Sequence, residues 1–277
     1  MTPAERERLA YQQAERYAEE LRDLYRRQRA EAHRLHQRRQ RRARVRTVLK
    51  GDGLRMVFQP IFPLDAERPS GFEALARFDA EPRQGPDVWF RDATEAGLAT
   101  ELELLAMSMA VEQLERLPDD TYLGVNLSPD TLMSLRFARS IASAPASRVV
   151  VEITEHAPID DYERLAKRLR PFRDLGGRVA VDDAGAGFAS LRHILALAPD
   201  IIKLDISLTR GIDGDRARTA LGRALISFAH EIEARIVAEG VETPAELEAL
   251  RELGVSHGQG YLLGRPGSAG EARSATR

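Results

Sequence analysis

The sequence of 277 residues contains no cysteine, which excludes a disulfide framework and a thiolate metal site. No uncharged run approaches the ~18 apolar residues of a membrane span. The first ten residues, MTPAERERLA, lack the apolar core of a secretion signal. We therefore expect a soluble, cytoplasmic protein. The hydrophobic fraction of 43% is ordinary for a globular protein, and the length admits one large domain or two small ones.

Lysine is also scarce, because only Lys50, Lys167 and Lys203 stand among 41 basic residues. All the other basic residues are arginines. Lys203 follows two isoleucines in a short apolar run, where a charged side chain is costly to bury. This pattern favours a position that needs a compact ammonium group rather than a guanidinium.

Charge is unevenly spread along the chain, although the formal net charge is only −2. Residues 26–46 hold ten arginines and one glutamate, a net charge of +9, whereas residues 1–25 carry −2 and residues 47–277 carry −9. Residues 3–46 contain no glycine, and no proline after Pro3, so they predict one long helix. Within it Ala10, Ala14, Tyr17, Leu21 and Leu24 follow the alternating spacing of a short coiled coil.

Two interpretations of this helix remain open. The first is a solvated helix that joins two protomers as a homodimer or meets a signalling protein. The second is a contact between Arg26–Arg46 and a polyanion, either nucleic acid or anionic lipid. Residues 26–46 contain no aromatic side chain, which disfavours stacking on bases.

After the break at Gly51-Asp52-Gly53, short apolar runs alternate with helical patterns. This alternation predicts βαβ units and a parallel sheet, and eight strands suit a closed (β/α)8 barrel of the TIM type. We expect a charged helix over residues 1–48, the barrel over 49–267 and a disordered tail over 268–277. The predicted strands are Met56–Phe62, Phe72–Phe78, Tyr122–Leu127, Val149–Thr154, Val179–Val181, Ile201–Leu204, Arg235–Ala238 and Gly260–Leu263.

The first connection breaks the pattern. Only residues 63–70 separate the first two predicted strands, and a parallel crossover needs about a dozen residues or more. The first strand should therefore pair antiparallel with the second, which gives an imperfect barrel.

Two adjacent acids, Asp182 and Asp183, end the apolar run Val179–Val181. Their mutual repulsion is compensated most simply by a cation. The alternative is a helix cap beside a solvated acid. Polar residues also lie within or beside the other predicted strands: Gln59 and Glu73 lie inside the first and second strands, and Gln259 precedes the eighth. We expect them at the barrel face where active sites lie. They are Gln59, Glu73, Arg77, Asn126, Glu152, Glu155, Lys203, Asp205, Glu239, Glu242 and Gln259.

A lone acid at a strand end is usually a cap or an ion-pair partner. Carboxylates that converge from several strands would repel one another by on the order of several kcal/mol without a divalent cation. Oxygen ligands favour Mg²⁺ or Mn²⁺ over Zn²⁺. The number of acids exceeds what one ion needs, so we expect a two-metal site, and such sites cleave phosphodiesters.

The sequence resembles the EAL-domain phosphodiesterases, bacterial enzymes that hydrolyse cyclic di-GMP to linear pGpG. The resemblance runs from about Leu49 to Pro266. It rests on Gln59-Pro60-Ile61, on Glu73-Ala74-Leu75 with Arg77, and on the segments VNLSP, VEITE, VDDAGAGFASL, IIKLD, VAEGVET and GQGYLL. It implies a barrel with an antiparallel first strand, two Mg²⁺ or Mn²⁺ ions per active site, a cyclic dinucleotide substrate and a homodimer.

The resemblance also implies roles for individual residues. Glu73, Asn126, Glu152 and Asp182 match ligands of a first metal, while Asp182, Asp183 and Glu239 match the site of a second. Lys203 matches the lysine that holds the attacking water, and Glu155 matches a glutamate that anchors the loop after the fifth strand. Positions near the substrate are matched by Gln59, Arg77, Asp205, Glu242 and Gln259.

That loop departs from the family pattern. Ala184, Ala186, Phe188 and Ala189 stand where the family usually has an aromatic residue and hydroxyl side chains. Gly185 and Gly187 keep the backbone freedom of the loop. The departure leaves a second function open, in which the domain is weakly active or inactive and binds cyclic di-GMP or docks on a protein.

Overall fold

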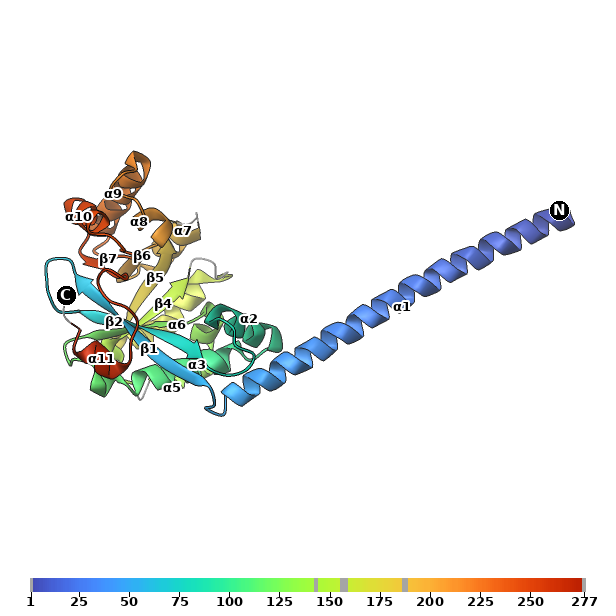
Figure 1. Cartoon of the computed structure of the whole chain (residues 1–277), viewed down its shortest axis with the longest axis horizontal. Helices are drawn as coiled ribbons and strands as arrows, with labels where there is room; N and C mark the ends of the chain where they lie inside the picture. Colours follow the sequence, from blue (N-terminus) through green and yellow to red (C-terminus); the bar gives the residue numbers. More distant parts are fainter. Residues whose placement is uncertain (1, 142–143, 155–158, 186–188, 276–277) are drawn as a thin grey trace.

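A computed structural model of the chain describes residues 2–275 apart from 142–143, 155–158 and 186–188. Figure 1 shows a long helix, α1 (Pro3–Val48), that projects away from a barrel formed by the rest of the chain. Within the described residues, no helix has the length and apolar character of a membrane span. The turn after α1 holds Gly51 and Gly53 at φ values of 99° and 80°, which glycine adopts without strain.

Eight strands close into a barrel in sequence order. Strand β1 pairs antiparallel with both β2 and β8, and the remaining neighbours are parallel, so the predicted barrel with an antiparallel first strand is confirmed. The strands are β1 (Leu54–Pro63), β2 (Gly71–Phe78), β3 (Tyr122–Asn126), β4 (Val149–Thr154), β5 (Arg178–Ala184), β6 (Ile201–Leu204), β7 (Arg235–Ala238) and β8 (His257–Gly258).

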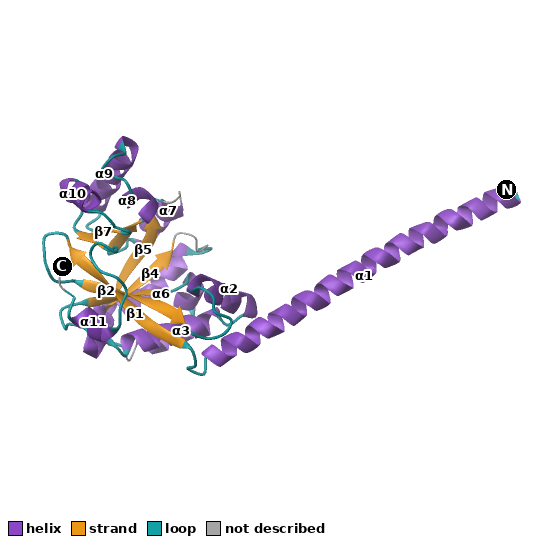
Figure 2. Ribbon diagram, in the orientation of Figure 1, coloured by secondary structure: helices purple, strands orange, loops and turns teal. Residues whose placement is uncertain are grey.

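Helices surround the strands, which lie at the centre of the domain in Figure 2. Capping side chains fix where several of them begin. Asp161 accepts a hydrogen bond from the Arg164 amide, and Thr243 and Glu246 form a capping box. The helices are α2 (Pro86–Ala96), α3 (Ala99–Val111), α4 (Pro129–Met133), α5 (Leu135–Ile141), α6 (Tyr162–Asp174), α7 (Ala189–Leu197), α8 (Ile206–Thr209), α9 (Arg216–Glu231), α10 (Pro244–Glu252) and α11 (Ala269–Arg273), with short 3-10 turns at Leu114–Arg116 and Ala146–Arg148.

The barrel interior is built in two layers because side chains alternate along each strand. One layer is an apolar cluster of Ile61, Tyr122, Val150, Ala180, Ile201 and Val237. Two residues further along their strands lie Glu152, Asp182 and Lys203, all buried. The apolar layer therefore forms the floor beneath a polar layer at the mouth of the barrel.

The last strand differs from its predicted position. Strand β8 is His257–Gly258, whereas residues 260–263 form a turn in which the Leu263 and Gly264 amides donate to the Gly260 carbonyl. The prediction of a strand at Gly260–Leu263 is wrong because Gly260 packs directly on the Val241 backbone, a contact that leaves no room for a side chain. The apolar run there serves to bury Leu263 rather than to extend the sheet.

The C-terminal segment also differs from the disordered tail predicted for residues 268–277. Ser268 and Glu271 form a capping box that starts α11. Ala269 and Ala272 are buried in the same core cluster as Phe58 of β1. The Phe58 amide donates to the Gly267 carbonyl at 2.7 Å, which holds the segment against β1.

The last turns of α1 are anchored to α2. Val45 and Val48 are buried with Trp89, and the carboxylate of buried Asp92 pairs with Arg41 and Arg44, each at 3.0 Å. Among the residues that the structure describes, only this end of α1 contacts the barrel, and the helix projects away from it as Figure 1 shows.

Candidate active site

Lys203 lies at the centre of the polar layer and is only 1% exposed. Its Nζ is 2.6 Å from Oε2 of Glu152 and 2.7 Å from Oε1 of Glu239. Oε2 of Glu73 and Oδ1 of Asp182 are each 3.4 Å away. Strands β2, β4 and β5 and the residue after β7 thus deliver four carboxylates to the ammonium group that β6 carries.

The electrostatics of this cluster follow from its composition. Burial disfavours the charged form of Lys203, but the four carboxylates outweigh burial and hold its pKa well above the ordinary value. Burial raises the pKa of Glu152 to about 8, against the attraction of Lys203. Burial likewise raises the pKa of Asp182 and of Glu239. One ammonium therefore leaves an excess of negative charge, which a divalent cation would neutralise.

Glu73 is the exception among the four carboxylates. Its pKa is lowered because Lys203 and two amide donors outweigh the effect of burial. Asn126 donates Nδ2 to Oε1 of Glu73 at 2.9 Å, and Gln259 donates Nε2 to Oε2 of Glu73 at 2.7 Å. Gln259 also donates to Oε1 of Gln59, whose own amide donates to the Gly264 carbonyl. Glu73 is thus held as an oriented carboxylate.

A second group of oxygens lies beside this cluster. Carboxylate oxygens of Asp182, Asp183 and Glu239 all fall within 4.8 Å of one another, a spacing that suits a shared metal ion. Asp183 has φ +59°, and its amide donates to Oδ1 of Asp182 at 3.0 Å. A non-glycine residue at positive φ stores on the order of 1 kcal/mol of strain.

The donor set fits hard divalent cations. All candidate ligand atoms are oxygens, which are the preferred ligands of Mg²⁺ and Mn²⁺. In addition, Oε1 of Gln259 is buried beside Glu73 without a hydrogen-bond partner. An orphaned buried acceptor at this place fits a water molecule held at a metal site.

Gly124 of β3 is a site residue that the sequence reasoning missed. A Cβ at this position would collide with the carboxylate of Glu152. The absence of a side chain on Gly124 therefore makes the space in which Glu152 meets Lys203. The sequence carries no signal for this role, since a glycine in a strand has several explanations.

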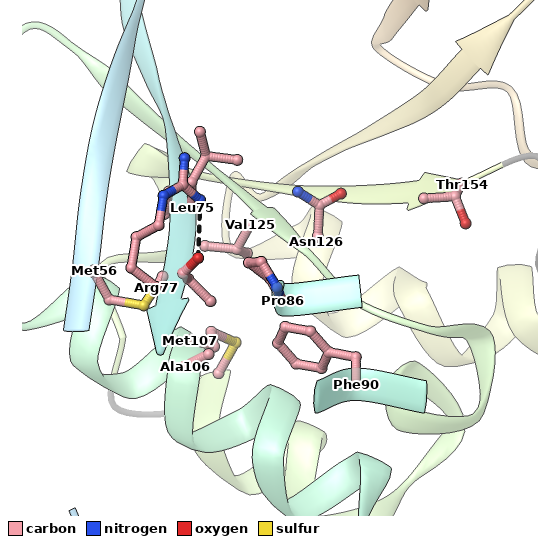
Figure 3. A pocket seen from close by; sticks show the side chains of 12 residues that line it. Met56, Leu75, Arg77, Pro86, Phe90, Ala106, Met107, Val125, Asn126 and Thr154 are labelled. Carbon is pink, nitrogen blue, oxygen red and sulfur yellow. Dashed lines mark hydrogen bonds between the residues drawn. The ribbon is translucent and has the colours of Figure 1, made fainter. Parts of the chain in front are cut away.

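Two hollows open at the mouth of the barrel. One, of about 320 Å³, exposes Glu73, Asp182 and Glu239 and is bordered by Tyr261. The other, of about 330 Å³, is largely apolar. In Figure 3 it lies between the ends of β2 and β3 and the helices α2 and α3, which contribute Phe90 and Met107.

Some predicted residues lie at the rim rather than in the cluster. Arg77 borders the apolar hollow, and its guanidinium donates to the Ala76 carbonyl. Glu242 borders the acidic hollow and pairs with Arg210 at 2.7 Å. Asp205 caps α8 by accepting from the Ser207 amide, so the structure gives it a role in local folding. Glu155, the predicted loop anchor, lies outside the described residues, as do residues 186–188.

The model of the EAL domain family matches residues 39–266. The chain belongs to the EAL domain family. It is 30% identical over 235 residues to the cyclic di-GMP phosphodiesterase NbdA of Pseudomonas aeruginosa, a match that covers 80% of this chain and 30% of NbdA. The chain spans less than half of the length of the curated relatives it matches.

Solved structures agree with this assignment. The PaMucR phosphodiesterase in complex with c-di-GMP is 27% identical, with a TM-score of 0.75 over 84% of this chain and 99% of that one. The manganese and cyclic di-GMP complex of BlrP1 from Klebsiella pneumoniae is 29% identical, with a TM-score of 0.70 over 78% of this chain and 57% of that one.

Proposed function

We propose that the protein is a metal-dependent phosphodiesterase that hydrolyses cyclic di-GMP to linear pGpG, with two Mg²⁺ or Mn²⁺ ions that activate the attacking water. The observation that carries the proposal is the buried Lys203 among four carboxylates at the mouth of the barrel. Family membership and the named phosphodiesterase relatives support the choice of substrate.

The candidate metal ligands divide into two sets. Asp182, Asp183 and Glu239 would hold one ion, because their oxygens already converge. Glu73, Asn126, Glu152 and Asp182 would hold the other. Asn126 uses Nδ2 to orient Glu73, which leaves its carbonyl oxygen for a cation. When bound, the ions supply an acidified water and neutralise charge on the phosphate oxygens.

Lys203 would position the attacking water. Its ammonium is buried, stays protonated and is fixed by contacts to Glu152 on β4 and to Glu239 after β7. A compact cation with three donors can hold a water oxygen and stabilise the hydroxide form. Lys203 also keeps the carboxylates close together before cations bind, because it offsets part of their repulsion.

The two hollows match the parts of a cyclic dinucleotide. The acidic hollow contains Glu73, and the apolar hollow contains Asn126, which is hydrogen-bonded to Glu73, so both adjoin the same carboxylate. Phe90 offers an aromatic surface to a base. The guanidinium of Arg77, at the edge of the apolar hollow, suits a phosphate oxygen. Gln59 and Gln259 border the acidic hollow and offer amide groups to the substrate.

The test compares substitutions of two lysines. Lys203→Ala should lower turnover of cyclic di-GMP by at least 100-fold, because loss of one positioning or electrostatic group commonly has this effect. Lys167→Ala is the matched control, since Lys167 is exposed and pairs with Glu163 on the surface of α6. Circular dichroism and thermal melting should show that both variants fold. Equal turnover by Lys203→Ala and Lys167→Ala would contradict the proposed mechanism.

The altered loop supports a second candidate, an inactive cyclic di-GMP-binding or protein-docking module. Ala184 is buried and brings no hydroxyl to the end of β5. This candidate would be selected if the wild-type protein bound cyclic di-GMP tightly without hydrolysing it. Replacing Ala184 and Ala186 with hydroxyl residues should then leave turnover absent.

A further inference from the structure

A row of large apolar side chains on α1 lies in solvent. Tyr17, Leu21, Leu24, Tyr25 and Leu35 are each between 51% and 67% exposed. Figure 1 shows that this part of α1 lies beside no other helix or strand that the structure describes. Scattered exposed apolar residues are normal, but a row along one helix indicates a binding face.

The row follows a heptad pattern. Tyr17, Leu21 and Leu24 are separated by four and three residues, and the same alternation continues through Gln28 and Glu31 to Leu35. Tyr25 lies beside Leu24 and Leu21 and widens the stripe. A stripe at this spacing is the seam of a coiled coil and needs a partner helix with a similar seam.

We propose that α1 pairs with α1 of a second copy of the chain in an antiparallel coiled coil. In the proposed register, Leu21 packs on Leu24 of the partner subunit, and Tyr17 packs on Gln28 of the partner subunit. The overlap runs over residues 7–38 of both helices, about 48 Å of rod at about 1.5 Å per residue. This length corresponds to roughly four and a half heptads, with Leu21 and Leu24 in the central layers of the seam.

Charge decides the orientation. A parallel pair would set Glu31 against its own copy, set Arg38 against its own copy, and align two segments of net charge +9. An antiparallel pair in this register instead sets residues 26–38, with five arginines and one glutamate, against residues 7–19, with three glutamates and two arginines. In this register the position of Arg38 faces the position of a glutamate, Glu7, in the partner sequence. The helix is therefore complementary to itself only when reversed.

The arrangement leaves both active sites accessible. The barrel holds α1 by its last turns, through Arg41, Arg44, Val45 and Val48. Reversed helices carry the two barrels at opposite ends of the rod, with neither barrel inside the seam. The pairing does not rest on the proposed function, and a variant of the seam should keep the turnover of the wild-type protein.

Cysteine cross-linking tests the pairing, because the chain has no native cysteine. Tyr17→Cys and Gln28→Cys variants of the full chain are oxidised separately, and then together after subunit exchange. The antiparallel register predicts a disulfide-linked dimer in the mixture and none in either variant alone. A control variant, Ala30→Cys, lies off the seam and should not link with either variant.

Two results would overturn the proposal. Cross-linking of Gln28→Cys with itself would show a parallel pair. No cross-link in any sample at about 100 µM protein would show that α1 does not pair with itself, whatever the mass of the particle. In that case, retention on heparin or on phosphatidylserine vesicles would be measured for a variant in which Arg34, Arg38 and Arg42 are changed to Gln. Loss of retention in this variant would show that the helix binds a polyanion.

Discussion

At the scale of single residues, the site depends on space as well as on charge. Sequence patterns placed Glu73, Glu152, Asp182, Lys203 and Glu239 at strand ends, and the structure brings all five together. The register of parallel strands makes this convergence predictable. The hydrogen bonds of Gln259 to Gln59 and Glu73 were not predictable, because they depend on how β8 closes against β1.

Gly124→Ala tests the role of space. The new methyl group would collide with the Glu152 carboxylate and displace it from Lys203, so turnover should fall by about 10-fold or more. The control is Gly214→Ala, where the added Cβ meets open space. Steady-state kinetics measures the loss of turnover, and equal melting temperatures of the two variants would show that both are folded. Unchanged turnover in Gly124→Ala would contradict the assigned role.

His257 of β8 gives a prediction for stability against pH. Burial and the nearby Arg235 lower its pKa to about 4, from an unfolded value of about 6.5. The folded state therefore binds fewer protons than the unfolded state between these values, and this contribution to stability is lost as pH falls from 6.5 to 4. After allowance for solvent screening, the loss should be on the order of 1–2 kcal/mol.

Denaturant unfolding of the wild-type protein and of His257→Gln, at pH 7.5 and pH 4.5, measures this contribution. The advantage of the wild-type protein over the variant should shrink at pH 4.5. If the unfolding free energies of the wild-type protein and of His257→Gln differ by the same amount at both pH values, His257 does not cause this pH dependence.

At the scale of elements, long periodic segments were predictable and short ones were not. Most strands and the helix α1 follow clear patterns of apolar residues. Strand β8 has only two residues, too few for any period, and the neighbouring apolar run lies in a turn. Helix α11 is stabilised by burial against β1, which a local pattern rich in small residues does not reveal.

The junction of α1 with α2 is the element contact that can be tested most directly. Asp92 is only 6% exposed and pairs with both Arg41 and Arg44. Asp92→Ala would remove the carboxylate partner of Arg44 and leave Arg41 paired with Glu95, and should lower stability by about 1–3 kcal/mol. Trypsin cleavage within residues 41–46 should become faster. The control, Asp23→Ala, removes only an exposed pair with Arg26 and should change neither measurement.

If trypsin cleaves Asp92→Ala and the wild-type protein at the same rate, Asp92 does not hold α1 on the barrel. The junction matters for function because α2 also contributes Phe90 to the apolar hollow. A displacement at the base of α1 would therefore reach the apolar hollow through α2.

At the scale of the whole molecule, one barrel gathers acids from many strands, and one helix stays outside it. The barrel and the family were predictable because motifs recur in order along most of the chain. The helix could be predicted as a helix, but its partner could not, because exposure and heptad pattern describe only one side of a contact.

The central claim is that this barrel uses divalent cations to add water across a phosphodiester. The most direct measurement treats the protein with chelator, adds cyclic di-GMP in ¹⁸O-labelled water, and then restores Mg²⁺ or Mn²⁺. We expect no product before metal is restored, and afterwards linear pGpG that carries one ¹⁸O on its new terminal phosphate. Product formed at the same rate in chelator, or no product with either metal, would contradict the central claim.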